Sequence, residues 1–165
     1  DRRKLLAFAR DLLRLQPDPL QAEVLSSHAR RGILCCTRQW GKSTIAAAKA
    51  VHEAFHNADS TILVAGPCER QSAELVRKIR LFAQKLNLPL QSDRSNRCSL
   101  VLPNESRVVG FPASNELLRG FSATLLLIDE AARVSDELYN TVRPFLAATN
   151  GDLWLMSTPN GKRGF

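Results

Sequence analysis

The segment that decides the fold is Cys36-Thr37-Arg38-Gln39-Trp40-Gly41-Lys42-Ser43, which follows a short apolar run and precedes an alanine-rich stretch. It matches the second half of the phosphate-loop pattern GxxxxGK[ST], with Cys36 where the pattern has its first glycine. Backbone N–H groups at a helix start point at bound phosphates, and the helix dipole favours anions there. The position between an expected strand and an expected helix favours a phosphate loop over a plain loop that leads into a helix.

Three residues of this loop have a direct chemical reason to be there. Gly41 lets the backbone come close to a phosphate, Lys42 reaches the terminal phosphates, and the Ser43 hydroxyl holds magnesium. The loop therefore predicts a site for ATP and Mg²⁺.

A second feature is the apolar run 125–128, which ends in the pair Asp129-Glu130. At the end of a buried strand, Asp129 can hold the magnesium ion or a water bound to it, and Glu130 can orient and deprotonate an attacking water. The alternative is an acidic helix cap after a core strand, for which either carboxylate would serve. The phosphate loop upstream favours the metal site, because a magnesium ion needs ligands on both sides of its coordination shell.

Strands and helices alternate along the chain. The expected strands are 33–36, 61–65, 98–102, 107–111, 124–129 and 152–156, and the expected helices are 3–15, 20–28, 42–56, 69–86 and 136–148. Pro144 is expected to kink or end the last helix. Because most strands are continuously apolar, we predict an α/β fold with a mostly parallel central sheet, flanked by helices and covered on both faces.

Length and composition limit the class of protein. The chain has 165 residues, which indicates a single domain, 1–165, with 44% hydrophobic and 24% charged residues. No apolar run reaches the roughly 18 residues of a membrane span. The formal charge of +7 suits a polyanionic partner and equally a basic domain without one. The cysteines Cys35, Cys36, Cys68 and Cys98 lack zinc-site spacing and are expected to be buried thiols.

The order of these features indicates a subtype. A strand intervenes between the loop strand and the Asp129-Glu130 strand, and a later strand ends in Ser157-Thr158. This layout looks like the additional-strand, catalytic-glutamate division of phosphate-loop NTPases. A simple strand-exit turn would explain Ser157-Thr158-Pro159 on its own.

The chain resembles the ATPase (motor) domain of the large terminase subunit of tailed bacteriophages. The segments that carry the resemblance are Thr37-Arg38-Gln39-Trp40-Gly41-Lys42-Ser43-Thr44, Leu118-Arg119-Gly120, Leu127-Ile128-Asp129-Glu130-Ala131-Ala132 and Ser157-Thr158-Pro159-Asn160-Gly161. The phosphate loop of that family commonly lacks the first glycine and has an arginine where Arg38 stands. The resemblance runs from Pro19 to Gly161.

The resemblance implies further roles. Gln21 looks like the glutamine that reads the adenine edge, and a surface helix residue is the alternative. Arg38 is a candidate for stabilising the γ-phosphate, against a solvated loop arginine. Ser157 and Thr158 resemble the motif that couples hydrolysis to movement, and Pro67 and Gln71 resemble a helicase-type motif. The predicted ATP-binding residues are Gln21, Thr37, Arg38, Gln39, Trp40, Gly41, Lys42, Ser43 and Thr44.

The family's function implies partners and a location. ATP hydrolysis would drive double-stranded viral DNA into a procapsid, with the portal protein and the small terminase subunit as partners, in the cytoplasm of a bacterial host. No membrane is expected to be involved, and a ring oligomer is expected when the motor is assembled. A neighbouring subunit could insert an arginine, with Arg94, Arg97, Arg119 and Arg133 as candidates. The family's C-terminal nuclease domain is expected to be absent from this fragment, which is therefore not expected to cut DNA.

Two other classes remain as alternatives. One is a fragment of a superfamily-2-like helicase or another nucleic-acid-stimulated ATPase, which the motif order does not exclude. The other is a nucleotide-binding module that has lost catalysis, and the intact Lys42, Ser43, Asp129 and Glu130 count against it.

Overall fold

A six-stranded sheet forms the centre of the computed structural model, which describes residues 3–91, 98–112 and 122–161. The strands are β1 (Arg31–Cys35), β2 (Thr61–Gly66), β3 (Ser99–Val101), β4 (Arg107–Pro112), β5 (Leu125–Ile128) and β6 (Asp152–Ser157). Their order is β1-β6-β5-β2-β4-β3. Every neighbouring pair is parallel except β3–β4, which forms an antiparallel hairpin. The predicted mostly parallel sheet is therefore confirmed.

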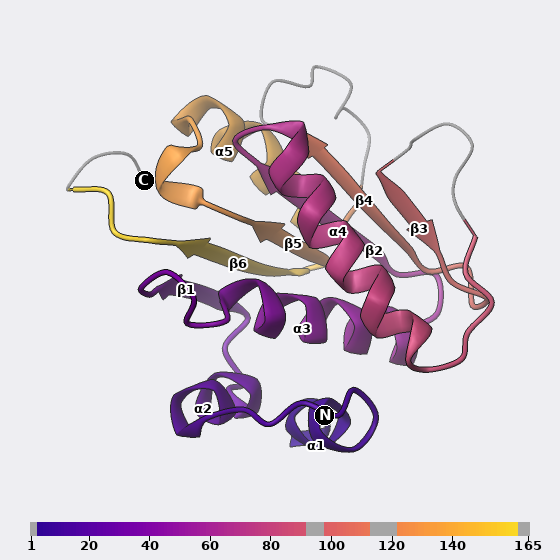
Figure 1. Cartoon of the computed structure of the whole chain (residues 1–165). Coiled ribbons are helices and arrows are strands. Elements are labelled where there is room, and N and C mark those ends of the chain that lie inside the picture. The colour runs from indigo at the N-terminus through magenta and orange to yellow at the C-terminus, as the bar shows by residue number, and fades with distance from the viewer. Residues whose placement is uncertain (1–2, 92–97, 113–121, 162–165) are drawn as a thin grey trace.

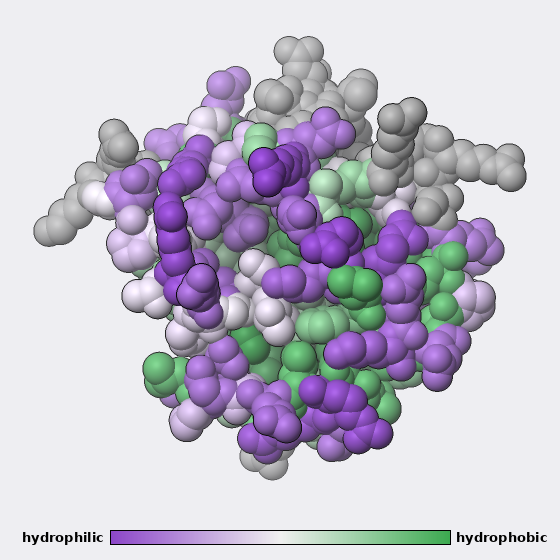
Figure 2. All heavy atoms as spheres, viewed as in Figure 1, coloured by the Kyte–Doolittle hydropathy of each residue, from purple (hydrophilic) through white to green (hydrophobic). Residues whose placement is uncertain are grey.

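The helices are arranged around this sheet as Figure 1 shows. They are α1 (Arg3–Asp11), α2 (Pro19–Ser26), α3 (Lys42–His56), α4 (Glu69–Gln84) and α5 (Asp136–Val142), with short 3₁₀ turns η2 (Ala131–Arg133) and η3 (Arg143–Leu146). Helices α3 and α4 cover one face, and α1 and α2 pack against α3 on its outer side. In the same view, hydrophilic side chains predominate on the surface, with apolar ones between them (Figure 2). No helix within the described ranges is long and apolar enough to cross a lipid bilayer.

Several helices end earlier than the sequence predicts. Helix α1 ends at Asp11 rather than Leu15, because Arg14 takes a left-handed backbone with φ of 56°. Helix α5 ends at Val142, and the chain continues as the 3₁₀ turn that contains Pro144. The expected effect of Pro144 is thus confirmed.

Two hydrophobic cores lie on the two faces of the sheet. The larger packs residues of all six strands against α1 to α4, and it includes the fully buried alanines of α3, Ala46, Ala47, Ala48, Ala50 and Ala54. Small side chains let this helix approach the sheet closely, which fixes its first turn relative to the strand ends. The smaller core packs β2, β5 and β6 against α5 and η3.

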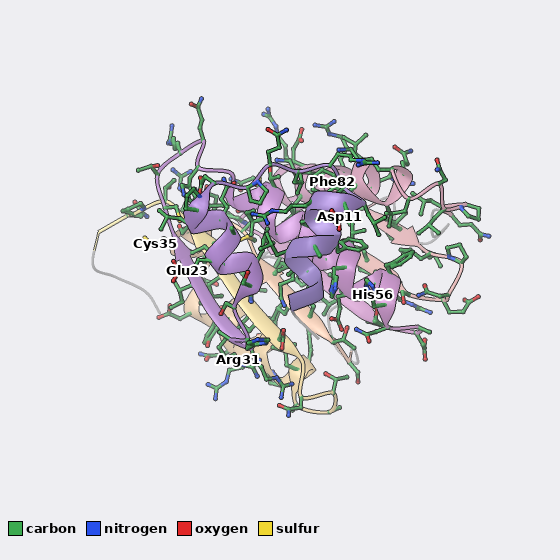
Figure 3. The ribbon with its side chains drawn as sticks, turned by 90° about the horizontal axis from the view of Figure 1, so that it is seen from below. Asp11, Glu23, Arg31, Cys35, His56 and Phe82 are labelled. Carbon is green, nitrogen blue, oxygen red and sulfur yellow. The ribbon has the colours of Figure 1, made fainter. Side chains whose placement is uncertain are left out.

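The expectation that both faces are fully covered is wrong at β1. On the α5 side, the side chains of Arg31, Ile33 and Cys35 are exposed, and Ile33 is 75% accessible. Figure 3 shows Arg31 and Cys35 at opposite ends of this strand. The reason is that β1 lies at the sheet edge, whereas the α5 core packs on β2, β5 and β6. For the same reason Cys35 is not a buried thiol, and Cys68, which precedes α4, is exposed too.

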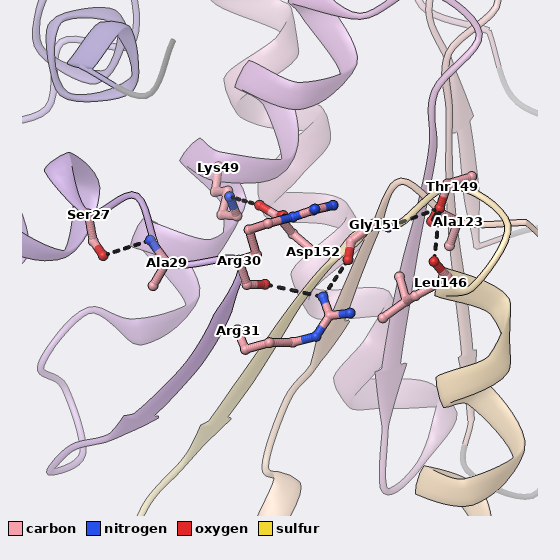
Figure 4. A network of polar contacts seen from close by, with 10 residues as sticks. All are labelled: Ser27, Ala29, Arg30, Arg31, Lys49, Ala123, Leu146, Thr149, Gly151 and Asp152. Carbon is pink, nitrogen blue, oxygen red and sulfur yellow. Dashed lines mark hydrogen bonds and ion pairs between the residues drawn. The ribbon is translucent and has the colours of Figure 1, made fainter.

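A buried ion pair joins α3 to β6 at the end of the sheet opposite the carboxyl ends of the strands. The Lys49 ammonium lies 2.9 Å from a carboxylate oxygen of Asp152, and Arg30 approaches the other oxygen at 3.3 Å. Figure 4 shows both cations converging on Asp152, with Arg31 donating to the Gly151 carbonyl oxygen beside them. Lys49 also lies 4.8 Å from the centre of the Trp154 ring.

This ion pair generates a stability prediction. Asp152→Asn deprives the buried Lys49 of its charged partner, so we expect a loss of about 3–5 kcal/mol in the free energy of unfolding. The matched control is Glu74→Gln, which breaks the exposed Glu74–Arg77 pair and should cost less than about 1 kcal/mol. Equal midpoints of urea unfolding for the two variants would contradict this account.

Candidate functional site

The turn from β1 into α3 forms one wall of the site. Gly41 precedes the first residue of α3 and has φ of 96°, a left-handed conformation that favours glycine. A Cβ at this position would lie only 2.9 Å from the Gln21 amide nitrogen. Gly41 leads directly into the N-terminus of a 15-residue helix, where the helix dipole and the first N–H groups favour an anion.

Lys42 begins this helix and is held by the loop itself. Its ammonium donates to the carbonyl oxygens of Cys36 at 3.3 Å and Thr37 at 3.0 Å, and the residue is only 8% exposed. The loop residues Thr37, Arg38 and Gln39 are exposed. Lys42 is therefore preorganised, with its charge fixed at the cavity wall before any ligand binds.

The end of β5 forms the opposite wall. Asp129 accepts a hydrogen bond from the Glu130 N–H at 3.0 Å, and Glu130 itself has φ of 48°. A left-handed conformation at a non-glycine residue is uncommon and costs free energy. The bend it produces turns the chain sharply out of the strand and places both carboxylates at the cavity.

Burial dominates the electrostatics of Asp129. Desolvation raises the pKa of this carboxyl above its ordinary value, the Glu130 N–H opposes the rise, and the neighbouring Glu130 charge adds to it. Lys42 and Lys78 lower the pKa to a smaller extent. A carboxylate in this position would be stabilised by a further positive charge.

Both walls enclose a cavity of about 500 Å³. Its lining residues are Arg38, Gln39, Gly41, Lys42, Ser43, Thr44, Gln71, Lys78, Asp129, Glu130, Arg133 and Thr158. The structure thus brings together most of the residues that the sequence singled out for ATP and metal binding. Thr37, Trp40 and Ser157 border this region without lining the cavity.

The segment after β6 is bonded to the turn after β5. The Thr158 hydroxyl donates to a carboxylate oxygen of Glu130 at 3.4 Å. The Ser157 hydroxyl accepts from the Ala132 N–H at 3.2 Å, and the Asn160 amide donates to the Ala132 carbonyl oxygen at 3.3 Å. Two bonds therefore link Ser157 and Thr158, the residues predicted for coupling, to the carboxylate predicted as the base and to the turn that follows it, and Asn160 adds a third bond to that turn.

Gln21 lies behind the loop rather than in the cavity. Its side-chain oxygen accepts from the Asp18 N–H at 3.1 Å in a capping box of α2, and its amide nitrogen donates to the Trp40 carbonyl oxygen at 2.6 Å. Both halves of the amide are therefore engaged within the chain. The role of Gln21 toward adenine stays a prediction, and the observed role is to hold α2 against the phosphate loop.

Two cations of the cavity extend the set that the sequence predicted. Lys78 was not singled out, although it lies seven residues, or two helical turns, after Gln71, and both line the cavity. Arg133 was considered only as an arginine for a neighbouring subunit, yet it lines the cavity of its own chain. Arg94, Arg97 and the segment 118–120 lie outside the described residues.

Residues 33–161 match the family model described as "RNA cytidine acetyltransferase NAT10/TcmA, helicase domain". The chain belongs to this helicase-domain family. The matched range includes the phosphate loop, the carboxylate pair and the segment after β6. This family corresponds to the helicase-type alternative that the order of the motifs does not exclude.

Terminases are among the curated proteins and solved structures that this chain resembles. The large terminase subunit of Thermus virus P23-45 is 25% identical, covering 94% of this chain and 36% of the relative. The chain thus spans about a third of the length of the curated relatives that it matches. The large terminase ATPase domain of Thermus phage P74-26 has a TM-score of 0.86 at 25% identity, covering 93% of this chain and 69% of that one.

A third similarity concerns the fold alone. The large terminase of a thermophilic bacteriophage, solved in complex with ADP, has a TM-score of 0.69 at 15% identity, covering 97% of this chain and 38% of that one. Together the similarities confirm the resemblance to terminase ATPase domains and the phosphate-loop ATPase fold. ATPase activity fits this fold.

The residues present fit a magnesium ion. Mg²⁺ prefers oxygen ligands, keeps several waters, and commonly takes only one or two protein ligands beside the phosphates of a substrate. Ser43 and Asp129 supply a hydroxyl and a carboxylate from opposite walls of one cavity. The desolvated carboxylate of Asp129 is the group that gains most from such an ion.

The burial of Asp129 predicts how stability depends on pH. Since its folded-state pKa is raised above 3.8, the folded protein binds this proton more tightly than the unfolded chain does. Above the folded-state pKa, the ionised Asp129 carboxylate therefore lowers the free energy of unfolding. This loss of stability vanishes as the pH falls below about 4. We expect Asp129→Asn to melt at a higher temperature than the parent at pH 7 without ligand, and the gain to disappear in acid.

The control for this variant is Asp136→Asn in the first turn of α5, where an acidic side chain interacts favourably with the helix dipole. That substitution should leave the melting temperature unchanged or lower it. If Asp129→Asn melts below the parent at pH 7, burial does not control this carboxyl.

Proposed function

We propose that this chain is the ATP-hydrolysing motor domain of a terminase large subunit, which moves double-stranded viral DNA into a procapsid. The observation that carries the proposal is the single cavity in which the phosphate loop, the Asp129-Glu130 pair and Thr158 meet. The similarity to terminase ATPase domains over nearly the whole chain supports it.

Each residue of the cavity has a role in this proposal. Lys42 and the start of α3 bind the phosphates, and Arg38 offsets charge that develops on the γ-phosphate. Ser43 and Asp129 hold Mg²⁺, which supplies neutralisation of phosphate charge when it is bound. Glu130 orients the attacking water and accepts its proton. Gln39, Gly41 and Thr44 complete the loop around the nucleotide, with Thr37, Trp40 and Gln21 supporting it from behind.

Ser157 and Thr158 supply the link from chemistry to movement. Thr158 responds to the charge of Glu130, because its hydroxyl donates a hydrogen bond to that carboxylate. Ser157 holds the turn that follows Glu130 by accepting a hydrogen bond from the Ala132 N–H. A change in the ionisation or position of Glu130 during turnover would alter both contacts. The segment after β6 would then move relative to β5.

The partners of this motor belong to the proposal as well. A portal protein and a small terminase subunit would hold it at the procapsid as a ring, in the cytoplasm of a bacterial host. The proposal assigns no DNA cleavage to residues 1–165. In such a ring, a neighbouring subunit could insert an arginine into the site. Arg38 and Arg133 already line the cavity of their own chain.

A second candidate is a nucleic-acid-stimulated helicase-type ATPase. The observation that favours it is the match of residues 33–161 to the helicase-domain family. The same cavity residues would hydrolyse ATP in both cases, so only the response to nucleic acid separates the two functions.

The assignment of Glu130 predicts a separation of binding from turnover. Glu130→Gln keeps the shape of the side chain and removes the base, so we expect ATP binding close to that of the parent and a loss of turnover of roughly 100-fold or more. Lys42→Ala should instead weaken binding itself. Glu137→Gln, an exposed glutamate in α5, is the matched control and should leave both unchanged. Parent-like turnover by Glu130→Gln would show that another group is the base.

The DNA function predicts stimulation and strong salt dependence. Contacts between Lys or Arg side chains and the DNA backbone release counterions, so duplex affinity should fall roughly tenfold or more between about 50 and 200 mM salt. ATP turnover should rise with double-stranded DNA while a short duplex stays intact. Unwinding of that duplex would favour the helicase candidate. A duplex affinity that does not change with salt concentration would contradict both candidate functions.

A further inference from the structure

Lys78 places a charge in the cavity from a helix outside the phosphate loop. It lies on α4, it is half-buried, and it lines the cavity next to the start of α3. The Thr44 hydroxyl oxygen is 3.5 Å from its Nζ atom, at the limit of a hydrogen bond. Among the described residues this neutral hydroxyl is the only hydrogen-bond partner of the Lys78 side chain.

The neighbouring cations of α4 are engaged differently. Arg77 forms an exposed ion pair with Glu74 at 3.0 Å, and Arg80 donates to the Ser99 carbonyl oxygen at 2.9 Å. Lys49 of the adjacent helix has the carboxylate of Asp152. Lys78 contrasts with all three, because it lines the cavity and, within the described part of the chain, has only the neutral Thr44 hydroxyl as a hydrogen-bond partner for its three N–H donors.

The charge of the cavity favours an anionic ligand at this position. Four cations line it, Arg38, Lys42, Lys78 and Arg133, against the two carboxylates Asp129 and Glu130. A triphosphate that has bound one divalent cation still carries net negative charge, so it would balance this excess.

We propose that Lys78 is a phosphate-binding residue of the nucleotide site, which contacts the polyphosphate beside Thr44. The inference rests on the proposed ATP site and adds to it a ligand from a second helix. Because Lys42 and Ser43 belong to α3 and Lys78 to α4, a bound polyphosphate bridges the two helices. Nucleotide occupancy is thereby transmitted to α4 without passing through Glu130.

The test uses Lys78→Gln, with Arg77→Gln as its control on the same helix. The probe is inorganic tripolyphosphate in EDTA, followed by the rise in melting temperature and by calorimetric affinity, so that neither metal nor turnover enters the readout. We expect Lys78→Gln to bind the probe about tenfold more weakly, as for loss of one charge-assisted hydrogen bond. Arg77→Gln should bind as the parent does.

The unliganded melting temperature separates ligand binding from a structural role. If Lys78→Gln binds tripolyphosphate as tightly as the parent, the proposal is wrong. A lower unliganded melting temperature together with parent-like tripolyphosphate affinity would show that Lys78 acts only on the fold. A parent protein that binds neither tripolyphosphate nor ATP would overturn the proposed function instead.

Discussion

Parallel pairing of β1, β6, β5 and β2 is the constraint on which the rest of the structure depends. Parallel strands end at the same edge of a sheet, so the residues that follow β1, β5 and β6 meet although they are about 30 to 120 positions apart in the chain. The close packing of the alanine face of α3 on this sheet fixes the first turn of that helix at the same edge. The cavity exists because these two conditions hold together. The Lys49–Asp152 pair secures the same helix to β6 at the opposite end.

Several features of the site lower the local stability of the fold. Asp129 is desolvated, Glu130 takes a left-handed backbone, and cations outnumber carboxylates around the cavity. The desolvated carboxylate and the left-handed backbone cost free energy. In the proposed function, a phosphate chain with its metal ion would offset the buried carboxylate and the excess of cations. The surrounding sheet and its two cores supply the stability that the site lacks.

The two sets of similarities concern the same chain. The match to the helicase-domain family covers the phosphate loop, the carboxylate pair and the polar segment after β6, and the match to a terminase ATPase domain covers 93% of this chain. Here that segment is bonded to Glu130 and to the turn after it. Both proposed functions use the same cavity residues, which is why motif order alone left both open.

The sequence by itself determined the strand and helix order, the phosphate loop and the Asp129-Glu130 pair, because these depend on local patterns of apolar and polar residues. Most boundaries agreed within a few positions, and the misses occurred where a left-handed residue or a proline ended a helix. Only the tertiary structure decided which cations reach the cavity. Lys78 and Arg133 are there because of how α4 and η2 pack, and Gln21 is engaged elsewhere because α2 docks behind the loop. Local pattern does not fix such packing, since it depends on contacts between residues far apart in the chain.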